Sequence, residues 1–280
     1  MKKTLVLLLL LALAAMPALA EEPLAPAAGE AVAVDLDGDG AGESVSWAYA
    51  PGDYDEVVTL TVTAADGTSC DYATGIVWNE VVDIVDLDGD GQWEILVSGD
   101  VMSDDYCAWC LRWDGDALYE VLFPDSGRVS ATDGYYLTGY GQITAISGNA
   151  VTLSGSQDVL GTWFGARTFE LGPHDRFEFC DDGLWVRDIE EIDDGLWEYG
   201  ALTVAAPLEY ADLDGNPVGT LQPGDKILIV ASDKQDMAQF ITPDGTEGVL
   251  AISPNYEKGW GLLVDGVSED ECFEYVPYAD

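Results

Sequence analysis

The feature that most constrains this chain is an acidic nine-residue segment, residues 86–94, which reads Asp-Leu-Asp-Gly-Asp-Gly-Gln-Trp-Glu. Mostly β-branched and aliphatic residues precede it at 81–85 and follow it at 95–97, which predicts a strand on either side. Glycines at its fourth and sixth positions permit the left-handed backbone of a tight loop. The segment therefore predicts a strand, an acidic loop and a second strand.

This loop brings four carboxylates together at its positions 1, 3, 5 and 9, those of Asp86, Asp88, Asp90 and Glu94. Two carboxylates about 4 Å apart repel each other by roughly 1 kcal/mol in water and about 4 kcal/mol near a protein surface. Such a loop needs a cation, and the Gln92 carbonyl at position 7 adds another oxygen. An all-oxygen site suits Ca²⁺, a hard ion that takes about six to eight ligands.

The same spacing occurs earlier in the chain, at residues 35–43. Its oxygen donors in order are Asp35, Asp37, Asp39, the Ala41 carbonyl and Glu43. An EF-hand begins in the same way but needs a glutamate at position 12 and a helix after it. Ser46 and Val97 occupy that position here, and the residues around them suit strands. An alternative is that both segments are Asp-Gly turns in an acidic protein.

The two segments resemble the strand-loop-strand calcium motif of FG-GAP and VCBS repeats, the units of integrin-type β-propellers. The match covers about 20 residues each time, without the Phe-Gly and Gly-Ala-Pro signatures of FG-GAP. The resemblance implies Ca²⁺ as the cofactor. A blade of about 50 residues leaves room for three blades between residues 31 and 190, and closed propellers have about four to eight. We therefore expect residues 31–195 to form a partial propeller or another β-sheet assembly.

Residues 1–20 have the pattern of a secretory signal peptide, with two lysines, an apolar run and an Ala-Leu-Ala end before two glutamates. We expect a secreted protein, extracellular or associated with the cell wall, without a membrane span. The net charge is −43, and it becomes −45 without that segment, which contains Lys2 and Lys3 and no acid. This charge excludes nucleic acid and anionic membrane surfaces as partners. Residues 21–30 lack periodicity and predict a disordered stub.

Asp-Gly dipeptides beside β-branched runs recur along the chain and predict hairpins in an all-β fold. Short strand patterns within 202–204, 218–230 and 238–250 are separated by the turns Asp214-Gly215, Pro223-Gly224 and Asp244-Gly245, and could close a small barrel that removes exposed edges. The stretch from about 200 to 253 resembles a bacterial SH3-like barrel, which we place in residues 196–280 with a C-terminal extension. Met237 and Val249 stand where family members carry aromatic residues of the peptide-binding groove.

Several other segments shape the organisation. A linker is predicted by the acidic run Asp188, Glu190, Glu191, Asp193 and Asp194, followed by Gly195. Asp212 begins an imitation of the acidic loops, but Pro217 replaces the glycine at position 6 and Thr220 the glutamate at position 9, so we predict a turn. A capping-box pattern after Ser268 predicts a short helix up to Tyr275.

Cysteine and histidine patterns offer weaker signals. Cys107 and Cys110 lie in a hairpin pattern, where alternation places them on opposite faces. A redox dithiol is thus disfavoured, and separate pairings with Cys70 or Cys180 stay open. His174, the single histidine, lies beside a proline and an aspartate and predicts an exposed turn.

Aromatic residues cluster near the middle of the chain. They are Tyr135, Tyr136, Tyr140, Trp163 and Phe164. They could form a platform for sugar rings, although aromatic strands more often fill a core.

The sequence as a whole favours a calcium-binding protein that is not an enzyme and acts in binding or adhesion at the bacterial cell exterior. Its partner would be a cell-surface or extracellular protein, glycan or peptidoglycan. The alternative is a secreted glycan or cell-wall hydrolase that uses acidic residues and has the SH3-like domain as a targeting module. Both functions follow from resemblance, and folds do not fix functions.

Overall fold

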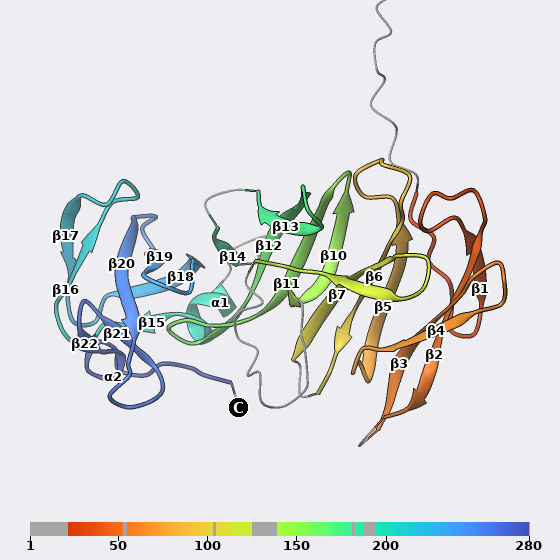
Figure 1. The fold of residues 1–280 in the computed structure, drawn as a ribbon. Helices are drawn as coiled ribbons and strands as arrows, with labels where there is room; N and C mark the ends of the chain where they lie inside the picture. Colours follow the sequence, from red (N-terminus) through yellow and green to blue (C-terminus); the bar gives the residue numbers. More distant parts are fainter. Residues whose placement is uncertain are drawn as a thin grey trace, which may run out of the picture.

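The computed structural model describes residues 22–52, 55–102, 105–124, 139–180, 183–187 and 194–279. Antiparallel strands, β1 to β22, dominate this part of the chain, and the two helices, α1 and α2, are short. The all-β prediction is confirmed. Neither helix is long and apolar enough to cross a membrane. Figure 1 shows the sheets side by side in chain order, from the orange first sheet to the blue C-terminal part.

The first sheet is a four-stranded antiparallel meander. Its strands are β1 (Ala31–Val34), β2 (Glu43–Pro51), β3 (Glu56–Thr63) and β4 (Ser69–Ala73). In β3, the buried side chains of Val58, Leu60 and Val62 alternate with more exposed threonines. This alternation is the pattern of a strand that packs one face against a core.

The second sheet has the same meander and gains one short strand from the segment that follows it. Its strands are β5 (Trp78–Val85), β6 (Glu94–Asp100), β7 (Tyr106–Trp113), β8 (Leu118–Val121) and β9 (Gly139–Tyr140). Both faces of β6 and β7 are buried. Cys107 belongs to the core shared with the first sheet, and Cys110 to the core on the other side. The predicted opposite faces are thus confirmed, and both side chains are free thiols.

The third sheet begins with another meander and continues into the C-terminal part. Its first strands are β10 (Gln142–Ser147), β11 (Ala150–Asp158), β12 (Thr162–Gly172), β13 (Arg176–Phe179) and β14 (Trp185–Arg187). The Gly148-Asn149 turn joins β10 to β11 directly. The third sheet therefore has no acidic loop at the position where the first two sheets carry one.

The C-terminal part contains the remaining strands and both helices. They are α1 (Asp194–Tyr199), β15 (Leu202–Thr203), β16 (Leu208–Ala211), β17 (Pro217–Leu221), β18 (Lys226–Ser232), β19 (Met237–Ile241), β20 (Glu247–Pro254), β21 (Leu262–Val264), β22 (Val267–Ser268) and α2 (Glu269–Cys272). The strand order is β18-β19-β20-β16-β17, with β15 on β18 and β21 on β20. Within the described residues, no pairing joins β17 back to β15, so this sheet stays open.

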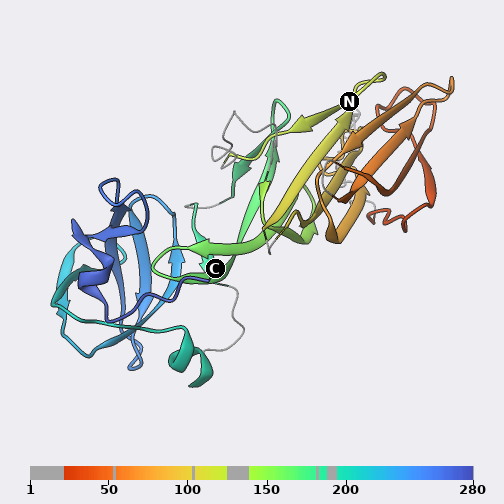
Figure 2. The ribbon, with the colours of Figure 1, turned by 90° about the horizontal axis from the view of Figure 1, so that it is seen from below.

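Strand β14 connects the third sheet to the C-terminal part (Figure 1), which lies at the end of the molecule opposite to the orange first sheet (Figure 2). Val186 pairs with Ala166 of β12 on one side and with Ala231 of β18 on the other. The neighbouring Trp185 is buried in one hydrophobic core that extends from the second sheet to Phe273. The sheet and its core therefore continue across the domain boundary that the sequence places at residue 195.

Residues 22–30 differ from the disordered stub that the sequence predicts. Leu24 exchanges two backbone hydrogen bonds with Ile84, each of 2.8 Å. The Trp47 indole donates to the Pro26 carbonyl at 2.7 Å. These contacts hold the segment against the first two sheets. They join residues far apart in the sequence, so a local pattern could not predict them.

The other local predictions have mixed outcomes. His174 lies exposed in a turn, as predicted. The helix after Ser268 exists, but it ends at Cys272 and lacks a side-chain capping hydrogen bond. Of the predicted linker, Asp194 and Gly195 begin α1. Residues 188–193 lie outside the described residues.

The role of β14 can be tested with two substitutions on the same strand. Trp185→Ala removes a side chain that is 1% exposed, and we expect a loss of about 3–5 kcal/mol in the free energy of unfolding. Val186→Ala removes a side chain that is 51% exposed, with an expected loss of about 0.5 kcal/mol or less. Urea unfolding followed by circular dichroism measures both. Equal midpoints would contradict a buried junction at Trp185.

Candidate metal centre

The two acidic loops occupy equivalent places in neighbouring sheets. The first loop, residues 35–43, joins β1 to β2, and the second loop, residues 86–94, joins β5 to β6. Gly89 and Gly91 have φ angles of 71° and 87°, which an L side chain rarely adopts. The loops therefore have the backbone turns that the sequence predicts at positions 4 and 6.

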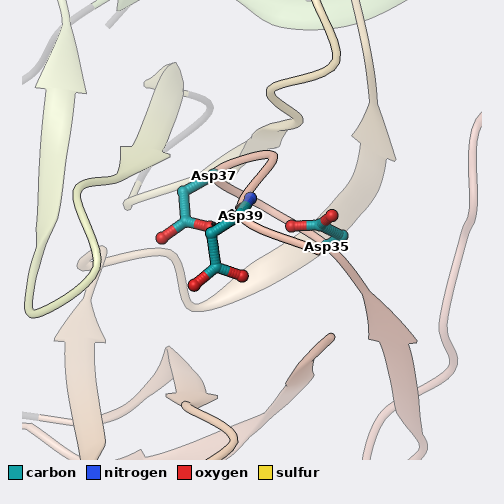
Figure 3. Close-up of side chains that lie close together, drawn as sticks. All are labelled: Asp35, Asp37 and Asp39. Carbon is teal, nitrogen blue, oxygen red and sulfur yellow. Dashed lines mark hydrogen bonds between the residues drawn. The ribbon is translucent and has the colours of Figure 1, made fainter. Parts of the chain in front are cut away.

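In the first loop, the backbone folds around its own carboxylates. The N–H of Gly40 donates to Asp35 Oδ2 at 2.9 Å, and the N–H of Ala41 donates to Asp39 Oδ1 at 2.7 Å. Figure 3 shows the side chains of Asp35, Asp37 and Asp39 gathered at this turn. One carboxylate oxygen from each residue lies within 4.8 Å of the others. This group could hold a metal ion.

One oxygen of this group is not satisfied by the protein. Asp35 Oδ1 is buried from solvent and has no hydrogen-bond partner, whereas Asp35 Oδ2 accepts from Gly40. A buried acceptor without a partner costs free energy. A cation bound among the three aspartates would remove that cost, so the residues present fit a metal ion.

The second loop repeats this geometry. The N–H of Gly91 donates to Asp86 Oδ2 at 3.0 Å, and the N–H of Gln92 donates to Asp90 Oδ1 at 2.7 Å. Asp86, Asp88 and Asp90 again bring one oxygen each within 4.8 Å of the others. Burial, followed by the nearby charge of Asp90, raises the pKa of Asp88. In both loops, the aspartates that the sequence selects are brought together.

The two glutamates at position 9 lie deeper than the aspartates. Glu43 and Glu94 are 3% and 0% exposed. Each accepts a hydrogen bond at Oε2 from the backbone of its own loop, from Leu36 at 2.8 Å and from Leu87 at 2.9 Å. Burial raises the pKa of Glu94 to about 7. These glutamates brace the loops, and they are not in the groups of oxygens within 4.8 Å.

The position-7 residues are held by hydrogen bonds within their own loops. The N–H groups of Ala41 and Gln92 donate to Asp39 and Asp90 of their own loops. This interaction fixes the direction of the backbone at each position. Their carbonyl oxygens stay predicted ligands, as do the second oxygens of the glutamates.

Sequence reasoning missed one residue of the centre, Arg112 of β7. Its guanidinium contacts Glu94 and Asp175, and its Nη2 lies 3.3 Å from Asp88 Oδ2 and 3.9 Å from Asp90 Oδ2. Burial lowers the pKa of Arg112, but the surrounding carboxylates outweigh that effect and raise it overall. The sequence signal for this residue is that Arg112 is the single charged residue of strand β7.

The first and second loops also contact each other. The N–H of Trp93 donates to the Leu36 carbonyl at 2.9 Å. A Cβ atom at Gly38 would lie 3.2 Å from the Gly91 carbonyl oxygen, so this position leaves little room for a side chain. Eight carboxylates of the two loops are therefore concentrated on one edge of two adjacent sheets.

The imitation loop at Asp212 has a different structure. Its side chain accepts from the N–H groups of Asp214 and Asn216, at 3.1 Å and 2.8 Å. Among the described residues, the metal-compatible groups are those of the first and second loops. The prediction that this segment is a turn is confirmed.

The aromatic cluster of the sequence divides between core and surface. Trp163 is buried in the core, and Phe164 is 52% exposed. Tyr140 lies partly buried, with its ring centroid 6.4 Å from that of Trp185. Tyr135 and Tyr136 lie outside the described residues. The predicted core role holds for Trp163.

A groove of about 470 Å³ lies where the C-terminal part meets the third sheet. Polar groups and aromatic rings line it, among them Asp158, Lys234, Asn255 and Trp260. Trp260 is 62% exposed. An open aromatic ring beside hydrogen-bonding side chains is chemistry that can bind a sugar ring. The sequence did not single out this groove, because its lining comes from segments far apart in the chain.

Comparison with known proteins adds no relative to these observations. No family model, no curated protein and no solved structure matches the chain.

Proposed function

We propose that this chain is a secreted, calcium-binding protein without enzymatic activity, acting in binding or adhesion at the bacterial cell exterior. The observation that carries the proposal is the pair of aspartate triads, each with one oxygen per residue within 4.8 Å. Both triads lie on loops with the same spacing, and both loops have the hydrogen bonds from position 6 to the first aspartate and from position 7 to the third. Such repetition in two sheets favours a shared ligand over chance turns.

The chemistry of the donors favours calcium. Each triad offers only oxygen, and the loop carbonyls at Ala41 and Gln92 could add more, in a flexible arrangement that suits a large hard ion. The buried oxygen of Asp35 that lacks a hydrogen-bond partner is available as a ligand for a cation. A bound ion would reduce the repulsion between the carboxylates and so stabilise the contact between the first two sheets.

The ligand side of the proposal rests on the groove near Trp260. An extracellular glycan would stack on the exposed indole and exchange hydrogen bonds with Asp158 and Asn255, which also line the groove. Calcium would then have a structural role, because the acidic loops and the groove belong to different parts of the fold. The hydrolase alternative differs in one outcome, the release of product.

Calcium should raise the thermal stability of the protein. At free calcium about 100 times the dissociation constant, each site adds about 2.7 kcal/mol to the free energy of unfolding. Thermal unfolding with calcium, with magnesium and with a chelator gives the comparison. Magnesium should stabilise less, because it demands a smaller, nearly octahedral site. An unchanged midpoint with calcium would refute the calcium proposal.

Substitutions should identify the loops that bind the ions. We expect Asp37→Ala and Asp88→Ala each to remove one calcium per chain, because each loop then loses one of its three clustered aspartates. Asp214→Ala is the matched control, since the turn at Asp212 forms no such group. Calorimetric titration measures the stoichiometry. If Asp214→Ala alone lowers it, the assignment of the two loops is wrong.

Binding without turnover should distinguish the two functions. The protein without residues 1–20 should bind labelled glycans or peptidoglycan fragments. Chromatography of the incubated ligand should show no released products. Trp260→Ala should weaken the binding at least about tenfold, because stacking on an exposed ring is lost. Trp78→Ala removes another ring that is 53% exposed, in the second sheet, and should leave it unchanged. Product release by the wild type would favour the hydrolase.

A further inference from the structure

Arg112 distinguishes the second loop from the first. Its side chain is 6% exposed and projects from β7 among the carboxylates of the second loop. It also contacts Asp175, in the turn between β12 and β13. The buried Arg112 side chain thus joins the second loop to the third sheet.

The first loop has no positively charged side chain at the position that corresponds to Arg112. In the second sheet, Ile95 pairs with Leu111, so Glu94 lies one step further along, opposite Arg112. In the first sheet, Ser44 pairs with Thr63, which places Ala64 in the same position opposite Glu43. Within the part of the chain that the structure describes, no ion pair involves the first loop.

We propose that Arg112 is a built-in counter-ion of the second loop, so that the two loops are unequal calcium sites and the first loop binds the ion more tightly. This inference rests on the proposed calcium binding and extends it. Asp88 and Asp90 are the ligands that the guanidinium approaches, at 3.3 Å and 3.9 Å. A calcium ion bound by these two aspartates would be repelled by the fixed positive charge of Arg112.

Arg112 has two opposite effects on calcium binding by the second loop, and its contacts show which effect is larger. Its contact with Glu94 holds that buried side chain in place, which favours a formed loop. Its charge beside Asp88 Oδ2 makes that oxygen a weaker ligand for a metal ion and repels a calcium ion. Glu94 is also held at its other oxygen by the Leu87 N–H at 2.9 Å, so this contact to the loop remains without Arg112. The repulsion therefore dominates, and removal of the charge should strengthen the second site.

Calorimetric calcium titration tests this on a background that isolates the second loop. Asp37→Ala removes the first site, and Arg112→Gln is then added to it. We expect the double variant to bind one calcium about tenfold more tightly than Asp37→Ala alone, because one opposing charge is gone. Conversely, Asp88→Ala should leave the tighter of the two wild-type sites. Equal or weaker binding after Arg112→Gln would overturn the inference.

Arg112→Lys serves as the second variant in case the glutamine variant does not fold. It keeps the charge and should leave the affinity of the second loop within about threefold of the parent. A tenfold gain with lysine as well would mean that the shape of the guanidinium matters and not its charge, which contradicts the counter-ion role. A wild type that binds two ions equally would refute the inequality while the proposed function stands. A wild type that binds none would refute both.

Discussion

The repulsion between carboxylates in two neighbouring loops is the constraint on which this structure depends. The loops are held together at that edge by the hydrogen bond from the Trp93 N–H to the Leu36 carbonyl. Backbone N–H groups offset part of the charge, and Arg112 offsets another part in the second loop only. The first loop therefore keeps four carboxylates without a cationic partner among the described residues, against one cation for the four of the second loop. Burial of Glu43 adds to the problem, because a charge in a protein interior is costly unless it is paired, and among the described residues only Glu94 of the two position-9 glutamates has an ion pair.

Signals within a few residues of each other predicted the fold class and the two loops. Alternation in β3 and the Asp-Gly turns depend on adjacent residues, and so does the spacing of Asp86, Asp88 and Asp90, which local backbone turns alone bring together. Arg112 enters the centre from another strand, 18 positions after Glu94, and its partner Asp175 lies 63 positions further on. Pairing over such distances depends on the packing of sheets, which no local pattern reveals.

The C-terminal part shows the same division between local and distant signals. Its strands and turns lie close to the predicted ones, and the turn at Asp212 is confirmed by the hydrogen bonds of that side chain. The connection to the third sheet was not visible in the sequence, because β14 has three residues and pairs with strands on both sides of the predicted boundary. A run of acids suggests a linker by composition alone. It carries no information about the short strand directly before it.

The shortness of β14 has a mechanical consequence. If the C-terminal part were held by a ligand on a surface while the remaining sheets were pulled by flow or by another attachment, the load would pass through this strand and through the hydrogen bonds of Pro277 and Ala279 to Thr162. Two residue pairs hold it on each side, whereas nine pairs join β11 to β12. Under tension, the junction should yield before either sheet tears. The chain would then lengthen at one defined place and leave the acidic loops intact.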